Sequence, residues 1–102
     1  MPRFDIFANP NKGATHPYFV DVQSNFVRLS TRWCIPLLRR NYSMQILSGV
    51  QALIEFEDQQ FLMDTGNLLA VPAQLLQRSS GKLSSDQQLL AESCIDFMLR
   101  GY

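Results

Sequence analysis

Apolar residues near the C-terminal end of this chain recur at helical spacing and predict one element of its fold, a helix. The apolar residues that recur there at helical intervals are Leu90, Ala91, Cys94, Ile95 and Met98. Ser84 and Gln87 form an S-x-x-Q capping box ahead of this run, and Asp86 suits the positive end of the helix dipole. We therefore predict a terminal helix over residues 85–99, which ends just before the chain does.

The residues ahead of this helix alternate between apolar and polar in short runs, as half-buried strands do. Strands are predicted over 3–8, 18–24 and 31–38, a hairpin over 52–65, and a further strand within 66–77 that Pro72 ends or turns. Several short strands followed by one helix indicate a small α+β domain that is mainly β. The length of 102 residues supports a single domain over 1–102.

Prolines and turn residues define the expected loops. Residues 9–17 hold two prolines, a glycine and two asparagines, and are expected to form a flexible loop. Residues 39–51 have a mixed pattern and are expected to be irregular. The hairpin is expected to turn at residues 57–60. Pro36 cannot donate a hydrogen bond to a sheet, so its strand is predicted to be bulged or at an edge there.

The charge balance argues against a nucleic-acid-binding domain. Nine basic and nine acidic residues cancel, and no acidic residue lies between Val22 and Ile54. Arginines that fall in this stretch are Arg28, Arg32, Arg39 and Arg40. We interpret them as solvated arginines around a loop in preference to a phosphate-binding patch. Charged residues make up only 18% of the chain, which favours a surface partly covered by a partner, such as a second copy.

The cysteines and apolar runs indicate a cytoplasmic protein. Cys34 and Cys94 belong to no CxxC pair, so both are interpreted as buried thiols in a reducing compartment. The apolar stretches are too short for a membrane span, and the N-terminus lacks the pattern of a secretion signal.

Residues with catalytic potential are few and scattered. His16 is a lone histidine in the proline-bearing loop and is interpreted as a solvated surface residue. One histidine and two distant cysteines form no recognised metal-ligand set, and no phosphate-binding loop is present. Glu55 and Glu57 are interpreted as a solvated strand edge, and Trp33 as packing. These residues indicate a binding module with no catalytic residue, metal or cofactor.

Several short motifs resemble those of one toxin family, in the same order and at similar spacing. They are "RFDIFA" (3–8), "FVDVQS" (19–24), "IPL" (35–37), "FLMDT" with "LLAVP" (61–72), "LS" (83–84) and the penultimate glycine, Gly101. Together they resemble the CcdB family, the toxins of type II toxin–antitoxin modules. The resemblance covers almost the whole chain.

The resemblance implies a fold and a mode of action. It implies a small SH3-like, MazF-like barrel of antiparallel strands with one C-terminal helix, and a homodimer. CcdB-like toxins bind the GyrA subunit of DNA gyrase and trap the cleaved gyrase–DNA complex. A CcdA-like antitoxin neutralises the toxin, and the pair represses its own operon, so operator DNA is bound only together with the antitoxin.

The resemblance also assigns candidate binding residues. Those for gyrase are Arg3, Phe4, Ser24, Phe26, Val27, Asp96, Arg100, Gly101 and Tyr102. Those for the antitoxin, by analogy with the loop over 9–17, are Asn9, Asn11, Lys12 and His16. Family members typically end in Trp-Gly-Ile, whereas this chain ends in Arg-Gly-Tyr. Tyr102 would supply an aromatic ring two positions beyond the usual one.

Two alternatives stay open at this point. The first is an endoribonuclease like the MazF toxins, in which the arginines over 28–40 would hold RNA and His16 or a carboxylate would act as the base. The second is an inactive homologue that still captures antitoxin, because a changed tail with an intact sheet surface fits that role. Fold alone does not decide among these functions.

Overall fold

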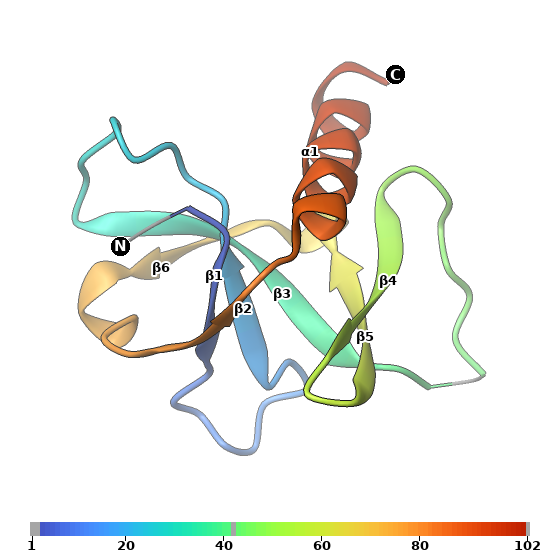
Figure 1. Cartoon of the computed structure of the whole chain (residues 1–102), viewed down its shortest axis with the longest axis horizontal. Helices are drawn as coiled ribbons and strands as arrows, with labels where there is room; N and C mark the ends of the chain where they lie inside the picture. The colour runs from blue at the N-terminus through green and yellow to red at the C-terminus, as the bar shows by residue number, and fades with distance from the viewer. Residues whose placement is uncertain (1–2, 42, 102) are drawn as a thin grey trace.

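A curled antiparallel sheet with one helix makes up the protein, as a computed structural model that describes residues 3–41 and 43–101 shows (Figure 1). The seven strands in these residues are β1 (Asp5–Ala8), β2 (Tyr18–Asp21), β3 (Thr31–Arg39), β4 (Gln51–Phe56), β5 (Gln59–Asp64), β6 (Leu69–Pro72) and β7 (Ser79–Lys82). Their order is β4-β5-β3-β2-β1-β7, and β6 also pairs with β3. The sheet forms a half-barrel, so the predicted mainly-β fold with a C-terminal helix is confirmed.

Strand β3 lies inside the sheet, but one of its sides has no partner at Pro36, so the strand is locally at an edge there, as predicted. Its first half pairs with β6 and its last three residues pair with β5, while β2 pairs along its other side. Pro36 falls between the stretch paired with β6 and the stretch paired with β5. On that side no neighbouring strand requires an N–H from residue 36, which explains how an interior strand tolerates a proline.

Helix α1 (Ser85–Arg100) confirms the predicted terminal helix and its start. Ser84 is the N-cap, and its side chain accepts a hydrogen bond from the Gln87 backbone while the Gln87 side chain accepts one from the Ser84 backbone. The helix ends at Gly101, whose φ of 82° is the left-handed conformation that glycine adopts without steric cost. Gly101 therefore has a structural role as the helix cap.

The β4–β5 hairpin turns more tightly than the sequence predicted. Phe56 pairs directly with Gln59, so the turn is Glu57 and Asp58 alone, and Gln59 and Gln60 already belong to β5. Both turn residues have positive φ, 51° and 61°, as a two-residue type I′ turn requires.

Strand β7 and two short 3-10 helices, η1 (Thr65–Asn67) and η2 (Ala73–Leu75), were not predicted. The residues of β7 are Ser-Ser-Gly-Lys, which carry no apolar alternation, and the strand forms because β1 pairs with it. Gly81 in β7 lies against the ring of Phe56 at the end of β4. This contact joins the two outer strands of the half-barrel.

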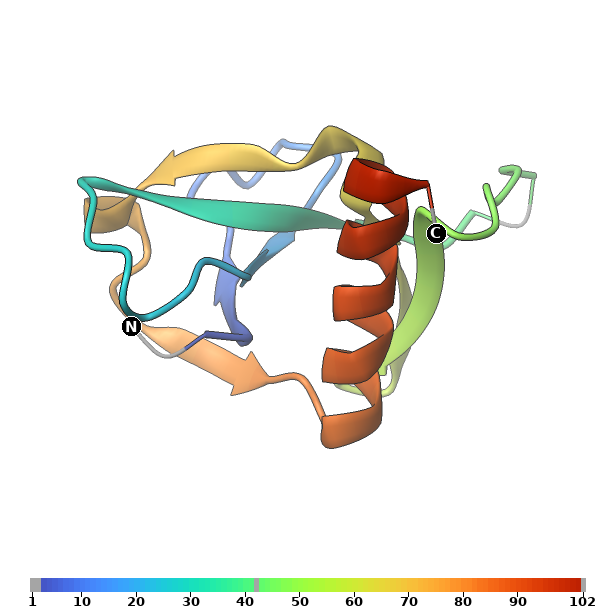
Figure 2. The same ribbon diagram turned by 90° about the horizontal axis from the view of Figure 1, so that it is seen from above.

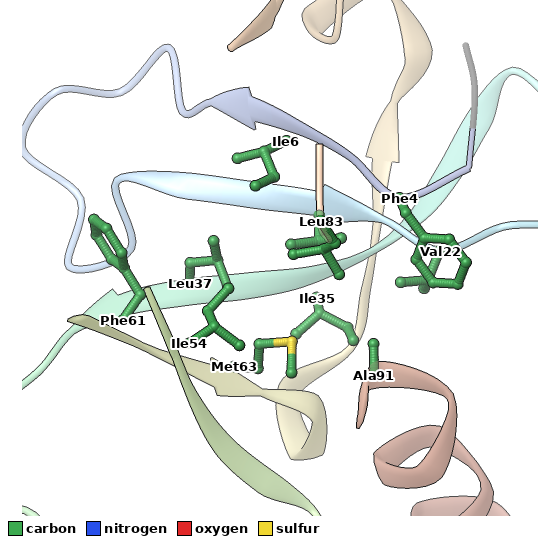
Figure 3. Close-up of a cluster of buried hydrophobic side chains, with 11 residues drawn as sticks. Phe4, Ile6, Val22, Ile35, Leu37, Ile54, Phe61, Met63, Leu83 and Ala91 are labelled. Carbon is green, nitrogen blue, oxygen red and sulfur yellow. The ribbon is translucent and has the colours of Figure 1, made fainter. Parts of the chain in front are cut away.

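Alternating side chains fill both faces of the sheet. On the concave face, Figure 3 shows Ile6, Ile35, Leu37 and Met63 packed together, with Ala91 of α1 closing one side of the cluster. The opposite face carries a smaller cluster formed by Phe7, Phe19, Cys34, Val71 and Leu76. Neighbouring residues such as Ile6 and Phe7 thus point to different clusters, as strand geometry dictates.

Both cysteines are buried and free, as predicted. Burial raises the pKa of the Cys34 thiol to about 12; the negative charge of Asp21 adds to this shift and Arg32 opposes it. Burial also raises the pKa of Cys94. The thiolate forms of both are disfavoured in the folded protein, so neither has the character of a reactive nucleophile.

We expect stability to fall above pH 9 because of Cys34. The unfolded thiol ionises near its ordinary pKa of 9.0, while the folded thiol stays protonated up to about 12. The unfolded state therefore binds fewer protons in this window, and rising pH costs up to about 1.4 kcal/mol per unit. Urea unfolding at pH 7, 9, 10 and 11 should show a steeper loss for the natural protein than for Cys34→Ala. Parallel curves for the two proteins would contradict the expectation.

A methyl group at position 81 should destabilise the closure of the half-barrel. A Cβ at Gly81 would lie 2.6 Å from Phe56 Cε1, closer than van der Waals contact permits. We expect Gly81→Ala to lower the free energy of unfolding by about 1–3 kcal/mol. Gly66→Ala is the control, because its Cβ would meet nothing nearer than Asp64 Oδ1 at 3.9 Å. Adding Phe56→Leu to Gly81→Ala should recover part of the loss; equal stability of the two alanine variants would refute the steric argument.

Candidate functional site: two partner-binding surfaces

A buried ion pair lies beneath the first candidate surface. Asp21 at the end of β2 is fully buried, and Arg32 in β3 donates to both of its carboxylate oxygens, at 2.7 Å and 3.0 Å. Two parallel N–H···O bonds of this kind are stronger and more directional than single ones. Arg32 is therefore not the solvated arginine that the sequence predicted, because its charge is paired inside the protein.

Gln23 extends this pair into the loop that follows, residues 24–30. Its backbone N–H donates to Asp21 Oδ1 at 3.1 Å, and its carbonyl accepts from Arg32 Nη2 at 3.1 Å. Its side-chain amide donates to the Val27 carbonyl at 2.8 Å and accepts from the Trp33 N–H at 2.9 Å. Loop 24–30 is thus tied at its base to buried groups, although its own side chains are exposed.

Phe26 stands at the exposed tip of loop 24–30. Its ring is 95% exposed, and Val27 beside it is also exposed. The turn that presents it is local: Ser24 Oγ accepts from the Phe26 N–H at 3.2 Å, and the Ser24 carbonyl accepts from the Val27 N–H at 3.0 Å. The structure therefore brings together the three predicted residues Ser24, Phe26 and Val27, with Ser24 shaping the turn.

Arg3 and Phe4 lie at the base of this loop, one at the surface and one inside. Arg3 Nε donates to the Val22 carbonyl at 2.8 Å, and the guanidinium lies over the Phe4 ring at 4.5 Å. Phe4 is only 6% exposed and adopts a φ of 74°, which is uncommon for an aromatic residue. Its N–H donates to the Asp21 carbonyl and its carbonyl accepts from Leu83, so this conformation is held from both sides.

The C-terminal turns of α1 carry the other residues predicted for gyrase. Asp96, Arg100 and Gly101 are all exposed, and Tyr102 lies outside the described residues. Phe97 packs on the backbone of Gly49, where a Cβ would come within 3.0 Å of its ring. This contact links the irregular segment before β4 to the end of the helix.

Loop 24–30 and the end of α1 project from the same end of the molecule (Figure 1). Seen from above, they lie on two sides of that end, with the loop leading into the start of β3 and the helix beside β4 (Figure 2). Exposed apolar side chains outside the predicted set accompany both: Leu29, Trp33, Leu89, Leu90, Phe97, Met98 and Leu99. One signal could have revealed the helical ones, because three consecutive apolar residues (97–99) cannot all face the core of one helix.

The loop over 9–17 forms a second candidate surface at the opposite end of the molecule (Figure 1). Asn9 is buried and closes the loop, donating to the His16 carbonyl at 2.9 Å and accepting from the Asn11 N–H at 2.9 Å. Asn11 and Lys12 are exposed. His16 is half-buried with its ring edge-on to Phe19 at 5.2 Å, so the prediction of a solvated histidine is wrong.

The other arginines of the acid-free stretch lie at the surface. Arg28 and Arg39 are exposed as predicted, and Arg40 is half-buried. Arg39 donates to Gln59, and Arg40 Nη1 donates to Gln60 Oε1 at 2.6 Å. In the part of the chain that the structure describes, no three His, Cys, Asp or Glu side chains gather as metal ligands would.

These features define a small β protein that exposes apolar side chains on a loop and on its helix, which is the character of a partner-binding protein. The family model described as "CcdB protein" matches residues 3–101. The chain therefore belongs to the CcdB family of toxins of toxin–antitoxin modules, which are gyrase poisons and not enzymes. The sequence resemblance is confirmed.

One further comparison and one feature of the helix bear on this result. No curated protein matches the chain. Among the described residues, no helix has the length and apolarity needed to cross a membrane.

Removing the charge of Asp21 should destabilise the fold and release loop 24–30. Asp21→Asn leaves Arg32 buried without its counter-ion, and breaking a buried pair in this way costs about 3–5 kcal/mol. We expect urea unfolding to show this loss, and amide exchange to speed up at Val27. Glu55→Gln, which removes an exposed carboxylate, is the control and should change stability by less than about 0.5 kcal/mol. A similar loss for both variants would contradict the assigned role of the pair.

Proposed function

We propose that this protein is a toxin that binds the GyrA subunit of DNA gyrase and traps the cleaved gyrase–DNA complex. A CcdA-like antitoxin neutralises it in the cytoplasm, and the two together bind operator DNA and repress their operon. Membership of the CcdB family supports this proposal. The observation that carries it is Phe26, an almost fully exposed aromatic ring on a loop tied to a buried ion pair.

An exposed aromatic on a pre-ordered loop suits a binding hot spot. Aromatic side chains bury a large area with few rotatable bonds, so they lose little entropy when a partner covers them. Loop 24–30 is already fixed by Gln23, which lowers the ordering cost further. The end of α1, exposed at the same end of the molecule, offers a second contact region through Asp96, Arg100 and Gly101.

We also propose that the toxin acts as a homodimer. Exposed apolar side chains on α1 and near loop 24–30 support this, because large exposed apolar side chains often mark a surface that a partner covers. Two copies would double the number of Phe26 rings available to a twofold-symmetric target.

The endoribonuclease alternative is set aside, because the toxins of this family are not enzymes. Two of the arginines that this alternative would use to bind RNA have partners within the protein: Arg32 pairs with Asp21, and Arg39 donates a hydrogen bond to Gln59. The experiment below tests the antitoxin-capturing alternative, because it includes a variant of Arg100, a tail residue that departs from the family.

A gyrase cleavage assay tests the proposal. The protein is incubated with gyrase, DNA and ATP, and the trapped cleaved DNA is measured for the natural chain and for Phe26→Ala. We expect cleavage by the natural protein and a loss of at least about tenfold for Phe26→Ala, as truncation of a central aromatic costs about 2 kcal/mol. Leu75→Ala, which truncates an exposed apolar side chain elsewhere, is the matched control and should act like the natural protein.

An Arg100→Trp variant separates the remaining outcomes. Cleavage by the natural protein establishes that the Arg-Gly-Tyr tail supports poisoning. Cleavage only after Arg100→Trp shows a competent scaffold whose tail has lost the target. If neither protein traps cleaved DNA, gyrase poisoning is refuted and antitoxin capture becomes the favoured role.

A further inference from the structure

A pocket of about 330 Å³ opens beside loop 9–17, outside every residue set considered above except His16. Five parts of the chain line it, with Thr15 and His16 in the loop, Pro36 and Leu38 in β3, Asp64 at the end of β5, Asn67 in η1 and Leu69 in β6. The pocket lies where β3 exchanges β6 for β5 as its neighbour. We name it the Asp64 pocket.

Asp64 is the charged group of this pocket, and its described partners are both neutral amides. It is 8% exposed; Oδ1 accepts from Gln51 Nε2 at 3.1 Å and Oδ2 accepts from Asn67 Nδ2 at 2.6 Å. A carboxylate has about four acceptor positions, so these two hydrogen bonds do not exhaust its capacity. A buried carboxylate held by amides alone would gain from a cation placed against it.

The apolar part of the lining restricts what that cation can be. Pro36, Leu38 and Leu69 form a wall that would favour a hydrocarbon stem over a hydrated metal ion. The two oxygens of a carboxylate match the paired N–H groups of a guanidinium, which binds carboxylates with two parallel hydrogen bonds. An arginine side chain combines this head with an apolar stem.

We propose that the Asp64 pocket receives an arginine side chain from an extended segment of the antitoxin. The inference rests on the proposed role of loop 9–17 as the antitoxin-facing surface, since Thr15 and His16 belong to both the loop and the pocket. Asn11 and Lys12 of the same loop are exposed and could contact the same segment. The guanidinium pairs with Asp64, and the stem packs on Leu38 and Leu69.

The test uses N-acetyl-arginine amide as the probe and follows the methyl groups of Leu38 and Leu69 by NMR. We expect saturable shifts of these methyls for the natural protein, with a dissociation constant on the order of millimolar. N-acetyl-citrulline amide has nearly the same shape without the charge and should bind at least about tenfold more weakly. Equal binding of the two probes, or no saturable shift with the arginine probe, overturns the proposal.

Two variants sharpen the test. Asp64→Asn removes the charge and should weaken arginine binding at least about tenfold, while Asp58→Asn removes an exposed carboxylate at the β4–β5 turn and should leave binding unchanged. If Asp64→Asn does not fold, the comparison of the two probes on the natural protein decides alone. If the natural protein traps cleaved gyrase complexes but does not bind the arginine probe, the proposed function stands and this inference is refuted. If it binds the arginine probe but does not trap cleaved DNA, gyrase poisoning is refuted and this inference stands.

Discussion

The ion pair between Asp21 and Arg32 fixes the part of the sheet from which the exposed loop projects. It connects β2 to β3 at a point where both side chains are buried. Gln23 adds two hydrogen bonds to the pair, because its backbone N–H donates to Asp21 and its carbonyl accepts from Arg32. The Asp21 carbonyl also receives the N–H of Phe4, so the N-terminal residues are held at the same place. Charges inside a protein are costly unless paired and hydrogen-bonded in this way. The loop that carries the exposed ring of Phe26 is therefore anchored by an interaction inside the protein.

Local patterns in the sequence predicted those elements whose cause is local. The capping box at Ser84 placed the start of α1, and apolar alternation placed most strands, because both depend on residues a few positions apart. Strand β7 could not be found in this way, since its polar residues form a strand only when β1 pairs with them. Pro36 predicted a local gap in the pairing of β3, but the sequence could not show that this strand lies inside the sheet. The break in pairing that accommodates this proline is created by β5 and β6, which come much later in the chain.

The candidate site shows the same division. Resemblance around the motif "FVDVQS" pointed to Ser24 and Phe26. Charge counting along the chain could not show that Arg32 pairs with Asp21 of this motif, so the interaction that holds the motif in place appears only in the structure. The half-buried position of His16 depends on Phe19, and no sequence spacing signals that contact. Phe4 was assigned to the gyrase-binding residues by resemblance, and the structure places its ring in the core with Arg3 above it.

Helix α1 is held unequally along its length, and this has a consequence for recognition. Its first turn is fixed by the cap at Ser84 and by the hydrogen bond from Gln87 Nε2 to the Glu55 carbonyl at 2.9 Å, and its middle is anchored by Ala91 and Cys94. The last turn has the contact of Phe97 with Gly49 and otherwise faces outward. A partner can therefore bend or repack the last turn while the half-barrel keeps its shape. Substitutions in the final residues would then alter this contact region without disturbing the packing that holds the half-barrel together.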